Sequence, residues 1–108
     1  MRESIIEKYL VDRVKAIGGE VRKVKWIGHR GAPDRVVMLP FLCPAYICDE
    51  YGTIWVELKA PGEKPEPHQA REHERMRAAG QHVVVIDSIE GVNALLCGID
   101  DVDALLGI

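Results

Sequence analysis

Apolar residues recur along this chain at two spacings, one typical of helices and the other of strands. Over residues 3–17 the apolar side chains lie four, four and three positions apart, on one face of a helix: Ile6, Leu10, Val14 and Ile17. The Gly18-Gly19 pair predicts the end of this helix. We expect a charged helix over residues 68–79, another that continues to residue 96 with Ser88 as its N-cap, and a last short helix in the final ten residues.

Four shorter segments have the alternating or continuous apolar pattern of β-strands. They are 20–27 (EVRKVKWI), 35–39 (RVVML), 53–59 (TIWVELK) and 82–86 (HVVVI). Residues 28–33 are typical of a loop, and PGEKPEP at 61–67 is too rich in proline to continue either neighbouring element. Residues 40–52 give a poorer signal, which predicts a loop with a short strand or hairpin arm.

The order of these elements, α-β-β-β-α-β-α, predicts the fold class. Three consecutive strands favour hairpin pairing, whereas the strand-helix-strand order near the end favours a parallel crossover. We therefore expect an α/β fold with a mixed β-sheet flanked by helices. A chain of 108 residues is long enough for one modest core and too short for two, so a single domain over residues 1–108 is expected.

Composition places the chain among ordinary globular proteins, with 47% hydrophobic and 29% charged residues. No apolar run approaches the roughly 20 residues that span a bilayer, and the charged N-terminus lacks a signal-peptide core. We expect a cytoplasmic protein with no membrane partner. The odd cysteine count, Cys43, Cys48 and Cys97, predicts buried thiols rather than disulfides. Cys43 and Cys48 would be half of a zinc site, but no second Cys/His pair lies at ligand spacing, so zinc is not expected.

The net charge of −3 conceals an uneven distribution of charge along the chain. Residues 13–35 hold seven basic and two acidic side chains, whereas the last 22 residues hold five acidic side chains and no basic one. Such segregation gives one face of a protein a positive potential, which attracts phosphate. The competing interpretation is a solvated charged strand, and the charges alone do not decide between the two.

The most informative motif is Pro33-Asp34, with Glu57-Leu58-Lys59 further along the chain. Side chains two apart in a strand share a face, so Glu57 and Lys59 point the same way and Leu58 points into the core. If the strand that begins at Asp34 lies beside the strand that ends at Lys59, the two carboxylates converge at one end of the sheet. Such oxygens suit Mg²⁺ or Mn²⁺, with the Leu58 carbonyl as a candidate third ligand.

These residue types match the needs of phosphodiester hydrolysis. A divalent cation, held by Asp34 and Glu57, neutralises charge in the transition state and lowers the pKa of a water. Lys59 is placed to orient that water or to balance the phosphate charge. The spacing alone leaves a second interpretation open, in which Asp34 is a turn residue after a proline and Glu57 pairs with Lys59 on a solvated strand.

Over nearly its whole length the chain resembles the VRR-NUC domains of the PD-(D/E)xK nuclease superfamily. The resemblance lies in the segments IEKYL, GHRGAPDRVV, VELKAPGEKPEPHQ and AAGQHVVVIDS. It implies a restriction-endonuclease-like fold and an active site of five residues: Glu7, Asp34, Glu57, Lys59 and Gln69. Glu3 lies on the same helical face as Glu7, so either is a candidate for the glutamate of the first helix. Glu7 is preferred because it adjoins the apolar stripe.

The resemblance also implies an activity and its partners. We expect a metal-dependent DNA endonuclease that uses Mg²⁺ or Mn²⁺ and no organic cofactor. Stand-alone members look like phage or bacterial proteins and resemble Holliday-junction resolvases, so a homodimer that cuts branched DNA is expected. The alternative is a non-catalytic nucleic-acid-binding module with the same fold. Candidate DNA-contacting residues are Arg22, Lys23, Lys25, His29 and Arg30.

Four other features of the sequence are expected to have roles outside the catalytic chemistry. Trp26 and Trp55 lie on predicted strands and are expected in the core or an interface. His73, one turn after Gln69, is expected to be a packed or exposed structural residue rather than a DNA contact. Residues 41–51 exceed the short hairpin usual for the family, which predicts an extra arm for dimerisation or DNA contact.

Overall fold

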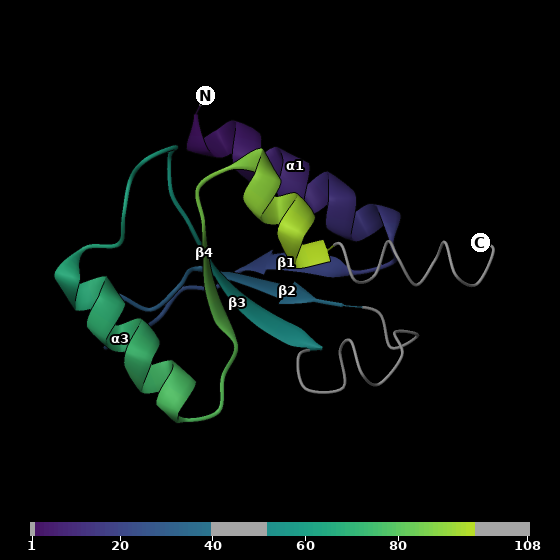
Figure 1. Ribbon diagram of the computed structural model, residues 1–108. Coiled ribbons are helices and arrows are strands. Elements are labelled where there is room, and N and C mark those ends of the chain that lie inside the picture. The colour runs from purple at the N-terminus through teal and green to yellow at the C-terminus, as the bar shows by residue number, and fades with distance from the viewer. Residues whose placement is uncertain (1, 40–51, 97–108) are drawn as a thin grey trace.

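The computed structural model describes residues 2–39 and 52–96 of the chain (Figure 1). Residues 89–96 are helical, and the elements before them are α1 (Glu3–Ala16), β1 (Glu20–Lys23), β2 (Arg35–Met38), β3 (Thr53–Leu58), α3 (Pro67–Ala78) and β4 (Val83–Ile86). The predicted order α-β-β-β-α-β-α is confirmed. The expected arm after residue 39, the three cysteines and the last short helix lie outside the described residues.

The four strands form one mixed sheet in the order β1-β2-β3-β4. β2 is antiparallel to both of its neighbours, and β3 is parallel to β4. The parallel pair is joined through α3, because parallel neighbours need a crossover connection rather than a tight turn. The predicted mixed sheet flanked by helices is therefore confirmed.

Helices cover both faces of this sheet (Figure 1). α1 and the helix at 89–96 lie side by side on one face, where the Tyr9 hydroxyl donates to Asn93 Oδ1 over 2.6 Å. The core lies beneath them and joins the stripe of α1 to alternate residues of β3: Ile6, Leu10, Val14, Ile54, Val56 and Leu58. The intervening residues of β3, Trp55 and Glu57, point to the opposite face, which α3 covers.

β1 is shorter than the sequence predicts, since it ends at Lys23. Its pairing with β2 reaches Val24, whose N–H donates to the Asp34 carbonyl over 2.9 Å. The next bonded pair in this register would be Trp26 with Ala32, and neither residue lies in a strand. The predicted strand over 20–27 is therefore wrong in its second half, because Gly28 and Gly31, both with positive φ, turn the chain into a loop instead of continuing an extended pair.

The helix ends follow the side chains that the sequence indicates. Gly18, directly after the last turn of α1, has a φ of 90°, a conformation that glycine adopts without steric cost. Ser88 Oγ accepts a 2.9 Å hydrogen bond from the Gly91 N–H, which confirms Ser88 as an N-cap. No helix in the two described ranges has both the length and the apolar character that crossing a bilayer requires.

Candidate active site

The sheet brings Asp34 and Glu57 together at the ends of neighbouring strands. Arg35 of β2 pairs with Val56 of β3, so the next pair along this antiparallel register is Asp34 with Glu57. The Asp34 backbone is held in place by the bond that its carbonyl accepts from the Val24 N–H. Two carboxylates far apart in the sequence thus meet at one end of the sheet.

Glu57 lies in surroundings that disfavour its negative charge. It is 8% exposed, and burial raises the pKa of its carboxyl to about 7, with the charge of Asp34 acting in the same direction. Lys59 and Arg35 lower this pKa without offsetting the rise. A cation between the two carboxylates would relieve both the burial of charge and the repulsion.

The oxygen atoms at this point fit a hard divalent cation. The 2.7 Å bond from the Leu39 N–H to the Gly52 carbonyl marks one bonded pair between the strands, and every second pair after it is also bonded. In this pattern Leu58 faces Pro33, and a proline cannot donate to the Leu58 carbonyl. Within the described ranges no three His, Cys, Asp or Glu side chains form a closed cage. The arrangement is an open one, of a kind that Mg²⁺ completes with water.

Lys59 is held by the glutamine that the family resemblance singled out. Its Nζ donates to Gln69 Oε1 over 2.8 Å, and the same oxygen accepts the Glu66 N–H over 2.8 Å in a capping box at the start of α3. The Lys59 N–H also donates to the Ile86 carbonyl over 2.9 Å. Backbone and side chain of Lys59 are therefore both fixed, beside Glu57.

The loop before Asp34 packs directly on the first turn of α3. Gly31 has a φ of 91°, and a Cβ placed there would lie 2.9 Å from the His68 carbonyl oxygen and 3.1 Å from Gln69 Cα. Real Cβ atoms do not approach so closely, so glycine is required on both grounds. This contact couples the position of Asp34 to that of Gln69.

Arg35 is a site residue whose role the sequence pattern did not indicate. It is 8% exposed and lies between two acids: its Nε donates to Glu7 Oε2 over 3.0 Å, and its Nη1 is 2.9 Å from Asp34 Oδ2. Its Nη2 also contacts Glu7. The available signal was an arginine at the start of an apolar strand, directly after Asp34.

The two candidate glutamates of α1 have different partners. Glu7, the preferred candidate, acts on the site through Arg35. The charge of Glu3 adds to burial and to Asp34 in raising the pKa of Glu57. Both acids therefore lie at the site end of α1, and they influence it by separate routes.

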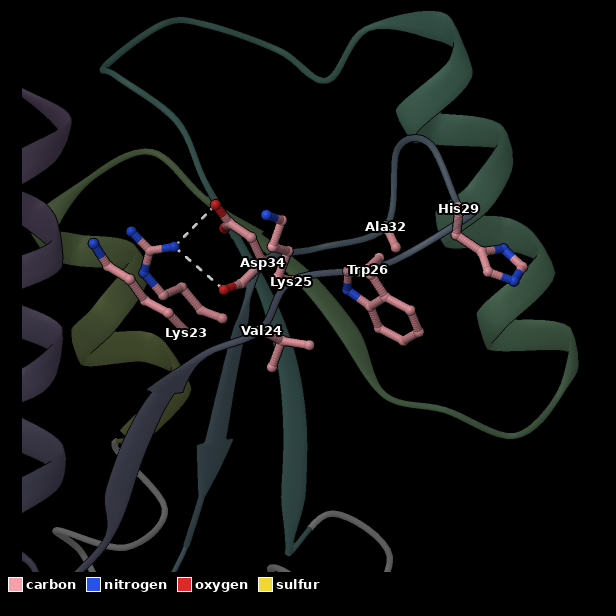
Figure 2. Close-up of a pocket in the computed structure, with 8 residues that line it drawn as sticks. Lys23, Val24, Lys25, Trp26, His29, Ala32 and Asp34 are labelled. Carbon is pink, nitrogen blue, oxygen red and sulfur yellow. Dashed lines mark hydrogen bonds and ion pairs between the residues drawn. The ribbon is translucent and has the colours of Figure 1, made fainter.

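A basic hollow of about 510 Å³ opens beside Asp34 (Figure 2). Cationic and ring side chains line it: Lys23, Lys25, Trp26, His29 and Arg35. Three of the five predicted DNA-contacting residues are among them. The other two are not: Arg22 is paired with Glu20 at 2.7 Å on β1, and Arg30 is exposed in the loop. The positive surface thus adjoins the carboxylate pair.

Trp26 and Trp55 are half-buried and packed together, with ring centroids 5.3 Å apart, although neither belongs to the core and Trp26 lies after the end of β1. The Trp26 indole N–H donates to the Pro33 carbonyl over 2.7 Å, and that of Trp55 donates to Gln81 Oε1 over 2.9 Å. The first of these bonds ties the loop before Asp34 back to the segment after β1. Both rings therefore support the site from the α3 side of the sheet.

His73 is 1% exposed, so it is packed and cannot contact DNA. Its Nε2 lies 3.5 Å from Glu57 Oε1. Burial lowers the pKa of its imidazole, and the charges of Arg77 and Lys59 act in the same direction, so the ring is favoured in its neutral form. The four-residue spacing from Gln69 was the only signal in the sequence for this contact.

The chain is similar to known proteins in both sequence and fold. No protein-family model matches it. Over 88 residues it is 49% identical to "Putative nuclease p44" of Acyrthosiphon pisum secondary endosymbiont phage 1. The matched region covers 82% of this chain and 85% of that protein. A solved structure described as a VRR_NUC domain superimposes with a TM-score of 0.71 at 40% identity, covering 87% of this chain and 92% of that one.

Proposed function

The chain belongs to the VRR-NUC family, and on that basis we propose that it is a DNA endonuclease that hydrolyses phosphodiester bonds with Mg²⁺ or Mn²⁺ at Asp34 and Glu57. The observation that carries the proposal is the pairing of these carboxylates across β2 and β3. Burial and the charge of Asp34 raise the pKa of Glu57 to about 7. Groups perturbed in this way cluster at functional sites, and a cation would offset the perturbation.

Each residue of the site has a separate task in this proposal. Asp34 and Glu57 hold the cation from neighbouring strands, and the Leu58 carbonyl supplies a third oxygen. When bound, the cation neutralises charge in the transition state and lowers the pKa of a water. Lys59, fixed by Gln69 at 2.8 Å, orients that water or balances the charge of the scissile phosphate.

Arg35 and Glu7 support Asp34 from the α1 side. The guanidinium of Arg35 is 2.9 Å from Asp34 Oδ2 and fixes the direction of this carboxylate. Glu7 holds the other side of the guanidinium and balances its charge in a buried position. Glu7 is therefore proposed to act by positioning, one residue removed from the cation.

The basic hollow gives the DNA backbone a place beside the carboxylates. Lys23, Lys25 and His29 line it together with Arg35. Cationic side chains that replace counterions around phosphate account for much of a protein's affinity for DNA. We infer that phosphates next to the cut site bind here.

Branched DNA and a homodimer complete the proposal, by analogy with Holliday-junction resolvases. The described part of the chain provides one such site, whereas a symmetric four-way junction requires two cuts. Sedimentation at micromolar protein concentration, with and without a four-way junction, tests the assembly. A dimer is expected, and a monomer under both conditions would contradict it.

The activity itself is tested on a labelled four-way junction, a flap and a plain duplex, each with Mg²⁺, with Mn²⁺ and with a chelator. Metal-dependent cuts, most rapid on the junction, are expected. Lys59→Ala should abolish them, while Lys64→Ala, a matched change in the exposed loop, should not. Binding without any metal-dependent cut would instead indicate the non-catalytic binding module.

A further inference from the structure

α3 and β3 face each other with matching repeats along one line of the site. Gln69 and His73 are four residues apart on α3, a rise of about 6 Å. Glu57 of β3 and Lys59, directly after the end of β3, are two residues apart along the extended chain, a rise of about 6.6 Å. Because the two spacings are nearly equal, each of the two helix residues lies opposite one of the two strand-side residues. Lys59 Nζ is 2.8 Å from Gln69 Oε1, and His73 Nε2 is 3.5 Å from Glu57 Oε1.

The His73 imidazole is a buried polar group that lies beside a carboxylate of the site. Among the described residues its Nε2 has no hydrogen-bond partner, although the side chain is 1% exposed. Buried nitrogens in folded proteins are nearly always satisfied. Glu57 Oε1, at 3.5 Å, is the acceptor that a small movement of either side chain would bring into hydrogen-bond range.

We propose that His73 is a positioning residue whose Nε2–H holds Oε1 of Glu57, so that the other carboxylate oxygen is presented toward Asp34 and the cation. This role rests on the proposed function, because it assigns His73 to the support of a metal ligand. It differs from the role of Gln69, which fixes the lysine and not the carboxylate. It also explains why a polar ring, rather than an apolar side chain, occupies a fully buried position on α3.

Removing such an outer partner of a ligand typically weakens metal affinity or activity by about 10–100-fold. We therefore expect His73→Leu to weaken Mn²⁺ binding, measured by calorimetry without DNA, and to raise the Mn²⁺ concentration for half-maximal cleavage by a similar factor. His73→Gln, whose amide nitrogen reaches the same point as Nε2, should restore both values to within a few-fold of the original. Arg71→Gln, on the exposed side of α3, is the control and should change neither.

A merely structural role would lower stability and leave Mn²⁺ affinity unchanged in the folded variants. Thermal unfolding measured on the same samples separates the two. A folded His73→Leu protein with the original Mn²⁺ affinity would overturn the proposal. If that variant does not fold, His73→Gln is compared with His73→Asn, whose shorter amide reaches the position of Nδ1, and equal affinities would overturn it.

Mn²⁺ binding and DNA cleavage by the original protein, measured beside the His73 variants, separate a failure of this proposal from a failure of the proposed function. If it binds Mn²⁺ in a His73-dependent manner and cuts no DNA, the nuclease is contradicted and the role of His73 stands. If it binds no Mn²⁺, both are overturned. If it binds and cuts, and the His73 variants do the same, only the role of His73 fails.

Discussion

At the scale of single residues, the proposed chemistry depends on Glu57, an acid that is 8% exposed and faces a second acid. In water the two carboxylates would separate, but the register of β2 and β3 fixes their backbones next to each other. Burial, with the charge of Asp34, raises the pKa of Glu57 to about 7. The metal-free protein is therefore destabilised by its own site whenever Glu57 ionises.

The raised pKa predicts a specific pH dependence of stability. Folded Glu57 binds its proton more tightly than the unfolded chain does, so its contribution to stability is fully present below pH 4.5 and is lost as pH rises through about 7. Glu57→Gln is neutral at every pH. In a chelator it should be more stable than the original protein at pH 8, and this gain should shrink by roughly 2 kcal/mol at pH 5.

Urea unfolding at the two pH values measures this difference. Glu63→Gln, in the exposed loop after β3, serves as the control and should give the same small change at both. A Glu57→Gln effect that does not depend on pH would show that the carboxyl is not perturbed.

A second prediction distinguishes the contributions of Glu3 and Glu7, the two glutamates of α1, to stability. Glu7→Gln removes one of the two acids that balance buried Arg35, so the free energy of unfolding should fall by about 1–3 kcal/mol. Glu3→Gln changes an exposed residue and should stay within about 0.5 kcal/mol. Urea unfolding at pH 7 compares them, and equal losses would mean that the Glu7–Arg35 pair does not stabilise the fold.

At the scale of elements, the periodicity of the sequence was sufficient to predict the order of helices and strands and the mixed sheet. The stripe of α1 and the Ser88 cap are local features, and both are present. The end of β1 was missed because the strand-like pattern of the sequence continues to Ile27, whereas backbone pairing with the segment before β2 ends at Val24. Arg35 and His73 were missed as site residues because their partners, Glu7 and Glu57, lie on other elements, at positions that only packing determines.

The loop from Gly28 to Pro33 joins the elements of the site, and Gly31 is its tightest point. Gly31→Ala would place a Cβ 2.9 Å from the His68 carbonyl oxygen at a φ of 91°. Gly62→Ala is a matched control, since Gly62 has a φ of 82° and open space around it. Both changes should cost about 1–2 kcal/mol through φ.

Only Gly31→Ala should also move Asp34 relative to Gln69, and so reduce the rate of cleavage at saturating metal. Unfolding and cleavage rates measured on both variants separate the two effects. Equal rates in the two variants would show that the contact between the loop and α3 does not position the site.

At the scale of the whole molecule, the overall charge of −3 is a poor guide to where DNA would bind. The basic hollow adjoins Asp34, so attraction for phosphate is concentrated where the cut is proposed. Arg22, also expected from the sequence to contact DNA, is partly neutralised by Glu20 at 2.7 Å. The pattern of charges along the sequence and the basic hollow point to the same region, and the ion pair of Arg22 with Glu20 distinguishes this arginine from the lysines of the hollow.

The basic hollow predicts how DNA affinity depends on salt. Each lysine that contacts a phosphate contributes about 1 to the slope of log affinity against log salt, so Lys23→Ala with Lys25→Ala should reduce the slope by about 2. Arg22→Ala should reduce it by less, because of its pairing with Glu20. Lys8→Ala, paired with Asp12 on the exposed side of α1, is the control. Fluorescence anisotropy from about 50 to 200 mM salt gives the slopes. An unchanged slope in the double variant would show that the DNA backbone does not bind at the basic hollow.

The most direct test of the Asp34–Glu57 site is the rate at which the protein cuts a labelled four-way junction with Mg²⁺, compared with Asp34→Asn, Glu57→Gln and the control Glu63→Gln. The original protein and Glu63→Gln should cut only when Mg²⁺ is present, and both site variants should be inactive while they remain folded and bind the junction. Cleavage by a folded Glu57→Gln protein at the original rate, or cleavage that persists in a chelator, would contradict a metal-dependent nuclease built on these two carboxylates.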